Sequence, residues 1–160
     1  MKRILLVLAA VFALSFGAQP AQAQLGLGVG AVWGDDRDLG IGGRLAFNLV
    51  PLPGSVISIQ ALGAFDYFLD CDDDCTYYEI TPAVGISAGL VGIGVYGGVG
   101  ANIARISFDD VAAGEDTSDT EVGAALIIGA RIPMGLFGEI RYTTGGAEQK
   151  VIAIGFRFGG

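Results

Sequence analysis

The segment VISIQALGAFDYFL, residues 56–69, decides the class of fold. Apolar residues take most alternate positions along it, and the polar residues Ser58, Gln60 and Asp66 lie on the other face. A period of two residues is that of a β-strand, in which successive side chains point to opposite faces. The segment therefore predicts a strand with one apolar and one polar face.

The same alternation recurs along the whole chain after residue 23. It predicts eight strands, most of them about ten residues long, which is the length that a tilted strand needs to cross a bilayer. Besides 56–69, the alternating segments are 24–33, 40–49, 77–89, 93–103, 121–132, 139–142 and 152–158.

A membrane-spanning helix is the competing interpretation of the uncharged run 80–104, which is 25 residues long. Seven glycines and Pro82 fall within it, the sequence GLVG at 89–92 is typical of a turn, and the remaining residues are largely those that favour strands. The run therefore predicts two strands and a turn.

The two faces of the strands have the polarity of a membrane barrel. Bulky apolar residues occupy one face, while glycines and charged residues occupy the other, an arrangement opposite to that of a soluble barrel. In hydrocarbon every backbone polar group must be bonded internally, so the strands must close. The sequence predicts an all-β fold, an eight-stranded antiparallel transmembrane β-barrel.

Charged residues on the inward face are expected to form an ion-paired network. A barrel of eight strands has room inside only for side chains, so opposite charges there should pair. A narrow polar pathway and acid–base catalysis are the alternatives. The candidates are Arg44, Asp66, Glu79, Glu121, Arg131, Glu139, Arg141 and Arg157.

The N-terminal residues 1–23 predict export. A basic start, an apolar segment and the small-x-small site ending at Ala23 are typical of a secretory signal peptide cleaved after that residue. The barrel domain is then 24–160. Removal of Lys2 and Arg3 changes the net charge from −8 for the whole chain to −10 for this domain. Such an acidic chain repels nucleic acid, which excludes nucleic-acid binding.

The connections between strands differ in length and charge. Those at 50–55, 89–92 and 133–136 are short and uncharged, and are expected to face the periplasm. The longer connections hold 13 of the 17 acidic residues and are expected to be extracellular; they are 34–39, 70–76, 105–120 and 143–149.

The second long connection carries the motif DCDDDC, residues 70–75. Cys71 and Cys75 are disulfide candidates because an exported chain meets an oxidising compartment. Zinc would need further thiol or imidazole ligands, which the sequence lacks. Calcium is a weaker alternative to a solvated acidic loop, as is a divalent ion bridging to lipopolysaccharide phosphates. The calcium candidates are Asp70, Asp72, Asp73 and Asp74.

Catalysis and cofactor binding have little support in the sequence. The chain has no histidine, which removes Ser-His and Asp-His chemistry. The segment GLGVGA at 26–31 fits a nucleotide-binding fingerprint, but it lacks the preceding strand and following helix that such a site needs. We therefore expect a protein that is not an enzyme and has no cofactor or specific metal.

Two C-terminal segments carry a family resemblance. GEIRYTTGG (138–146) and KVIAIGFRF (150–158) resemble the penultimate and last strands of the small outer-membrane β-barrel family of OmpX-, OmpW- and OmpA-like proteins, often labelled "porin family". The resemblance covers 24–160 and implies an eight-stranded barrel inserted by the outer-membrane assembly machinery. That machinery reads a terminal aromatic strand, which Phe156 and Phe158 provide, although Gly159 and Gly160 follow them.

These observations predict a monomeric protein of the bacterial outer membrane, in contact with lipid and lipopolysaccharide. We expect a structural or surface-interaction role through the long loops. A narrow channel for small solutes or apolar compounds, an adhesin-like binder and a soluble periplasmic binder are the alternatives. Pro82 lies mid-strand on the lipid face, and we expect a bulge or a later strand start there.

Overall fold

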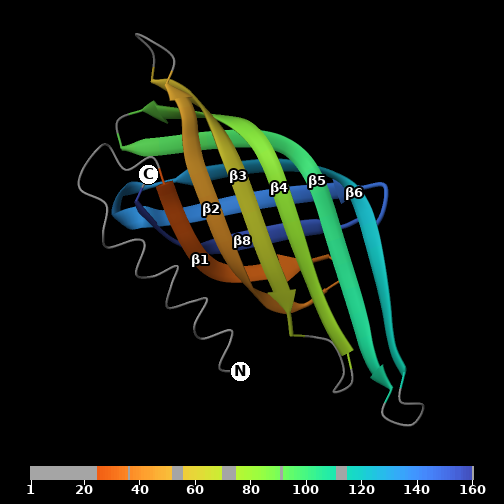
Figure 1. Cartoon of the computed structure of the whole chain (residues 1–160). Coiled ribbons are helices and arrows are strands. Elements are labelled where there is room, and N and C mark those ends of the chain that lie inside the picture. Colours follow the sequence, from red (N-terminus) through yellow and green to blue (C-terminus); the bar gives the residue numbers. More distant parts are fainter. Residues whose placement is uncertain are drawn as a thin grey trace.

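The computed structural model describes residues 25–35, 37–51, 56–69, 75–90, 92–110 and 115–159. Within these ranges eight antiparallel strands form a closed barrel, in which β1 pairs with β8 (Figure 1). This confirms the predicted fold class. The strands are β1 (Leu25–Gly34), β2 (Leu39–Pro51), β3 (Ile57–Phe68), β4 (Cys75–Leu90), β5 (Ile93–Asp110), β6 (Glu115–Arg131), β7 (Leu136–Thr144) and β8 (Lys150–Gly159).

The barrel has two ends that differ in their connections. We call the end with the β2–β3, β4–β5 and β6–β7 connections the turn end, and the opposite end the loop end. At the turn end a short 3₁₀ segment, Pro133–Gly135, joins β6 to β7. Met134 and Gly135 have positive φ values of 75° and 83°, so the chain reverses within a few residues. No helix in the described ranges is long and apolar enough to span a membrane.

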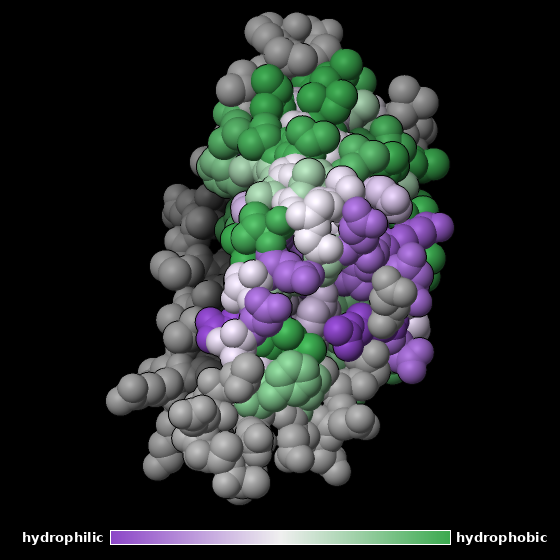
Figure 2. Space-filling model, turned by 90° about the vertical axis from the view of Figure 1, so that its right-hand side faces the viewer, coloured by the Kyte–Doolittle hydropathy of each residue, from purple (hydrophilic) through white to green (hydrophobic). Residues whose placement is uncertain are grey.

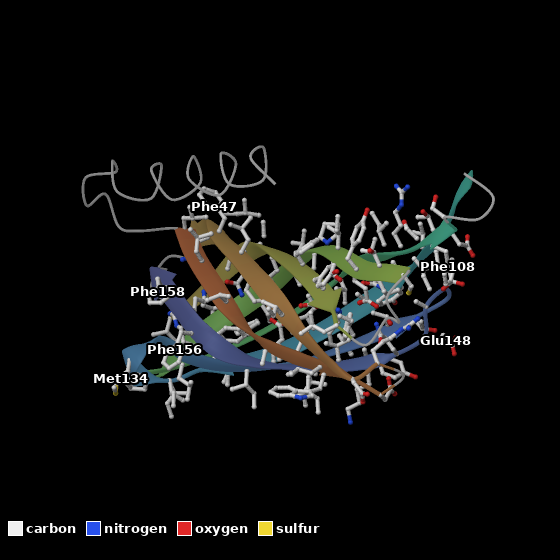
Figure 3. The ribbon with its side chains drawn as sticks, turned by 90° about the horizontal axis from the view of Figure 1, so that it is seen from below. Phe47, Phe108, Met134, Glu148, Phe156 and Phe158 are labelled. Atoms are coloured by element: carbon white, nitrogen blue, oxygen red, sulfur yellow. The ribbon has the colours of Figure 1, made fainter. Side chains whose placement is uncertain are left out.

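The outward face is apolar over the whole circumference. Ile41, Val84, Val99 and Ile128 are each more than half exposed, although such residues are usually buried in soluble proteins. Exposed aromatic side chains lie toward both ends of the barrel: Trp33, Tyr67 and Tyr142 toward the loop end, and Phe156 and Phe158 toward the turn end, where they point away from the barrel (Figure 3). This distribution suits a barrel that is surrounded by hydrocarbon and bordered by aromatic residues.

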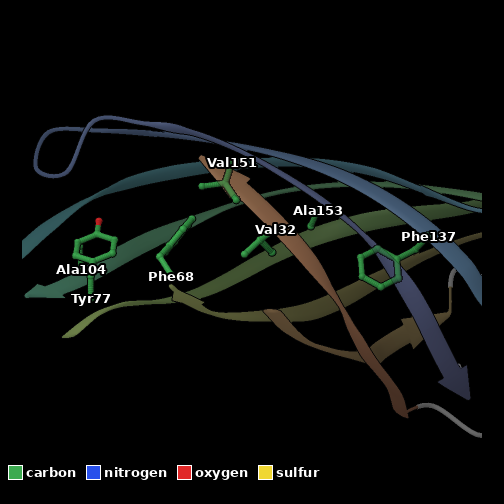
Figure 4. Packing of buried hydrophobic residues seen from close by; sticks show 7 residues of the cluster. All are labelled: Val32, Phe68, Tyr77, Ala104, Phe137, Val151 and Ala153. Carbon is green, nitrogen blue, oxygen red and sulfur yellow. The ribbon is translucent and has the colours of Figure 1, made fainter. Parts of the chain in front are cut away.

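The interior contains apolar side chains as well as charged ones. One buried cluster lies inside the barrel and consists of Val32, Phe68, Tyr77, Ala104, Phe137, Val151 and Ala153 (Figure 4). A second consists of Ala46, Leu62, Ala83, Tyr96 and Ile127. The expectation that glycines and charges fill the interior was therefore incomplete. These apolar residues occupy the same alternate positions of their strands as the predicted inner residues, so they also point inward.

Glycines allow close backbone approach where β1 meets β8. Gly30 and Gly155 are directly paired across these strands. A Cβ atom added at Gly30 would lie 2.8 Å from Gly155 Cα, and one added at Gly155 would lie 2.5 Å from Gly30 Cα. The closing pair of strands therefore has no room for a side chain at this level on its inner face.

The expected loop 105–120 is largely a β-hairpin, which corrects that prediction. Strand β5 continues to Asp110 and β6 begins at Glu115, with paired residues along the whole length between them. The segment lacks the apolar face that marks the other strands in the sequence. Backbone hydrogen bonds propagate the ladder without such a face, and the hairpin extends from the barrel at the loop end (Figure 1).

Pro82 is accommodated without a bulge, which corrects the second expectation. The β4–β5 register is the same before and after Pro82, since Ile80 pairs with Ile103 and Ala83 with Gly100. Thr81 and Pro82 have no assigned partner in β5, as expected where proline removes an amide donor. The Thr81 hydroxyl donates to Asn102 Oδ1 at 2.7 Å, and this buried bond links the two strands at the interruption.

Candidate functional site

A row of five charged side chains crosses the middle of the barrel. Arg44 contacts Glu139 at 2.7 Å and Asp66 at 2.6 Å, and Arg141 contacts Asp66 at 2.5 Å and Glu79 at 2.6 Å. The charges thus alternate in the order Glu139, Arg44, Asp66, Arg141, Glu79. All five are buried, and Arg141, Asp66 and Glu79 are fully so. We call these five residues the ionic plug.

The ionic plug joins strands that do not neighbour one another in the sheet. Glu139 and Arg141 lie two residues apart on β7, so both point inward. Their partners lie on β2, β3 and β4, whereas the sheet neighbours of β7 are β6 and β8. Three of the four ion pairs therefore cross the lumen and hold opposite walls together, while Arg44–Asp66 joins the adjacent strands β2 and β3.

Tyrosines and a glutamine complete the hydrogen bonds of the terminal carboxylates. The Tyr96 hydroxyl donates to Glu139 Oε2 at 2.9 Å, and the Tyr77 hydroxyl donates to Glu79 Oε1 at 2.7 Å. Gln149 Nε2 donates to the same Glu79 oxygen. At Gly129, the ring of Tyr96 occupies the space that a Cβ would need.

The plug leaves little free space at its level. A cavity of about 10 Å³ lies between Arg44, Tyr96, Phe137 and Arg157. A single water needs roughly that much probe-occupied volume. The ion pairs of the plug lie across the lumen between two larger cavities, one toward each end of the barrel.

The loop-end cavity is acidic and has a volume of about 310 Å³. Its lining includes three carboxylates, those of Asp119, Glu121 and Glu148, and one cation, Arg37. The Arg37 guanidinium lies 4.2 Å from the centroid of the Tyr77 ring, a cation–π contact on the floor of the cavity. Figure 2 shows the side of the molecule that lies on the right in Figure 1, and hydrophilic side chains gather on this side. The cavity suits a cationic group.

The structure divides the eight predicted inner charges into two groups. Arg44, Asp66, Glu79, Glu139 and Arg141 meet in the ionic plug. The other three lie toward the ends: Glu121 lines the loop-end cavity, while Arg131 and Arg157 line a cavity at the turn end. The single network expected from the sequence is therefore smaller than predicted.

The acidic motif of the second loop lies mostly outside the described residues. This applies to Asp70, Cys71, Asp72, Asp73 and Asp74, and also to the predicted signal peptide 1–23. Cys75 opens β4 and is disulfide-bonded, and the chain has one other cysteine. Within the described ranges, no group of three or more metal-ligating side chains is found.

The sequence did not identify Tyr77 and Gln149 as uncharged partners of the ionic plug, or Arg37 as the cation that lies over Tyr77. Gln149 and Arg37 lie in segments that were expected to be loops, and Tyr77 adjoins another such segment, 70–76. The alternation does give a signal for Tyr77, since it has the same parity as Glu79 on one strand. No pattern in the sequence places Arg37 over Tyr77.

Comparison with known proteins shows the fold. No family model matches the chain, and no curated protein matches it. Among solved structures, the attachment invasion locus protein Ail of Yersinia pestis superimposes with a TM-score of 0.59 at 15% identity, covering 84% of this chain and 96% of Ail. The N-terminal β-barrel domain of Pseudomonas aeruginosa OprF gives 0.56 at 12% identity, covering 86% and 98%. Neisserial surface protein A (NspA) gives 0.55 at 11% identity, covering 83% and 92%.

Proposed function

We propose that this chain, which has the fold of the small eight-stranded outer-membrane β-barrels, is an integral protein of the bacterial outer membrane that acts through its loop end. The observation that carries the proposal is the combination of an apolar outward face with a lumen closed by the ionic plug. A closed lumen supports a surface role over transport. The protein is then a non-enzymatic monomer, inserted by the outer-membrane assembly machinery and in contact with lipid and lipopolysaccharide.

The insertion part of this proposal is tested by gel mobility. A closed membrane barrel resists mild SDS until it is heated. The outer-membrane fraction should therefore give a compact, faster band when unboiled and a slower band after boiling. Recovery of the protein in the periplasmic wash without detergent, with no shift on boiling, would contradict insertion.

The charge of the loop end indicates which partners it suits. The loop-end cavity has three carboxylates and one arginine, and the hairpin beyond it adds four acidic residues, Asp109, Asp110, Glu115 and Asp116. We therefore propose a partner that presents cationic groups. Ail has been crystallised with the heparin analogue sucrose octasulfate, a polyanion, and the acidic loop end of this chain supports the opposite preference.

Binding of a short oligolysine peptide tests this charge preference. Glu121→Gln, which removes a carboxylate from the cavity, should weaken binding about two- to fivefold at low salt, the effect of one exposed charge pair. Asp38→Asn removes the same charge from an exposed residue outside the cavity lining and is the matched control. Preferential binding of sucrose octasulfate, or equal losses in the two variants, would contradict the proposal.

The β5–β6 hairpin provides an independent test of the surface role. Its outer part, 109–116, lies beyond Cys75, the first residue of β4, which pairs with Phe108, and it can be replaced by a two-residue turn across the Phe108–Thr117 pair. We expect the shortened barrel to keep its heat-dependent mobility shift and to bind oligolysine more weakly. Loss of the mobility shift would show that the hairpin is needed for folding instead.

A further inference from the structure

The turn end contains a cavity of about 210 Å³ with a positively charged lining. It has room for several waters, or for a small anion with some water. The polar residues around it come from six strands, and Asp and Glu are absent from its described lining. These residues are Asn48, Ser58, Gln60, Ser87, Tyr96, Arg131 and Arg157.

Arg157 is the central cation of this cavity. Within the described ranges it forms no ion pair, and its buried Nε has no hydrogen-bond partner. Its guanidinium lies 5.9 Å from the centroid of the Tyr96 ring. The nearby carboxylate of Glu139 is already engaged by Arg44 at 2.7 Å and by the Tyr96 hydroxyl at 2.9 Å. Among the described residues, the charge of Arg157 therefore has no anion paired with it alone.

Further donors converge on the same space. Gln60 is 2% exposed, and its amide nitrogen has no hydrogen-bond partner among the described residues. The hydroxyls of Ser58 and Ser87 lie 2.7 Å apart on adjacent strands. A second arginine, Arg131, lines the cavity and donates to Gly159 O at 3.5 Å. Buried donors without partners are costly, so a ligand that accepts from them is favoured.

We propose that the turn-end cavity binds a tetrahedral oxyanion, namely a phosphate group. Arginine forks match both carboxylates and phosphates. Polar side chains on six strands around one space suit an anion with four oxygen atoms better than a planar carboxylate with two. The aromatic residues Phe156 and Phe158 point outward at this end (Figure 3), which places the cavity near the membrane surface, so the group can come from a lipid or from solution.

Calorimetric titration of the refolded, full barrel in a phosphate-free detergent such as octyl glucoside tests the site. The probe is inorganic phosphate, with acetate as the planar comparison. We expect saturable phosphate binding that is tighter than acetate binding, and a loss of at least about tenfold in Arg157→Gln, since hydrogen bonds to charged groups are strong. Arg105→Gln removes the same charge from an exposed arginine toward the loop end and should leave the phosphate affinity unchanged.

A second probe distinguishes the source of the group. If dihexanoyl phosphatidic acid binds more tightly than inorganic phosphate, the ligand is a lipid headgroup; equal affinities indicate free phosphate. The mobility shift on boiling verifies folding of each variant, and Arg131→Gln replaces Arg157→Gln if the latter does not fold. The proposal is overturned if neither probe binds saturably, if acetate binds as well as phosphate, or if Arg105→Gln causes the same loss. These results are independent of oligolysine binding at the loop end.

Discussion

At the scale of the residue, Arg141 is the side chain on which the ionic plug depends most. It is fully buried and contacts Asp66 at 2.5 Å and Glu79 at 2.6 Å. Replacing it by Met leaves Glu79 buried without a cationic partner in the described part of the barrel, which costs about 3–5 kcal/mol of the free energy of unfolding. Urea titration of the refolded barrel measures this loss.

Two further variants distinguish the effect of an unpaired buried charge on stability from the effect of lost packing. Adding Glu79→Gln to Arg141→Met removes the unpaired charge and should recover part of the lost stability. Arg105→Met, at an exposed arginine that donates to Ser118 Oγ at 3.3 Å, should change the free energy by no more than about 0.5 kcal/mol. Similar effects of Arg141→Met and Arg105→Met would contradict the role assigned to the plug.

The inner charges also show how far the sequence predicts the site. Alternation correctly indicates that Arg44, Asp66, Glu79, Glu139 and Arg141 point inward, because each strand has a period of two. It does not give the height of a residue along the barrel axis, which depends on strand tilt and register. The structure was therefore needed to distinguish the plug from the two end cavities. It was also needed to place Arg157 beside Tyr96.

At the scale of the element, closure of β1 on β8 depends on paired glycines. A side chain at Gly155 would meet the backbone of Val29 and Gly30, so Gly155→Val forces the two strands apart. Overpacking of this kind costs about 1–3 kcal/mol, and more where backbone must move. Gly138→Val is the control, because a Cβ there meets no atom within 4 Å and the residue pairs with Ile154 on the same β8. Urea midpoints should fall for Gly155→Val and stay near the wild-type value for Gly138→Val; the reverse order would contradict this account.

Strand boundaries were predictable where apolar alternation persists and failed where it ends. The turn at 133–136 follows from its uncharged sequence and short length, and the structure places Pro133–Gly135 there. The hairpin beyond Ala104 has polar residues on both faces, so no pattern distinguishes it from a loop. Its strands form because the ladder established at Gly94–Arg131 continues residue by residue to Asp110–Glu115.

At the scale of the whole molecule, the barrel has an acidic cavity at one end, a basic cavity at the other and the ionic plug between them. Because buried, ion-paired side chains lie across the lumen, we expect hydrated ions to have no continuous path. We expect no stepwise conductance when the folded protein is added to a planar bilayer at neutral pH. Arg131→Ala should leave this result unchanged, since Arg131 lies in the turn-end cavity outside the plug.

The double variant Arg44→Ala/Glu139→Ala removes the contacts that cross from β2 to β7 and should produce small conductance steps. Stable steps in the wild-type protein, absent from a sample boiled before addition, would instead favour the narrow-channel function over a surface role.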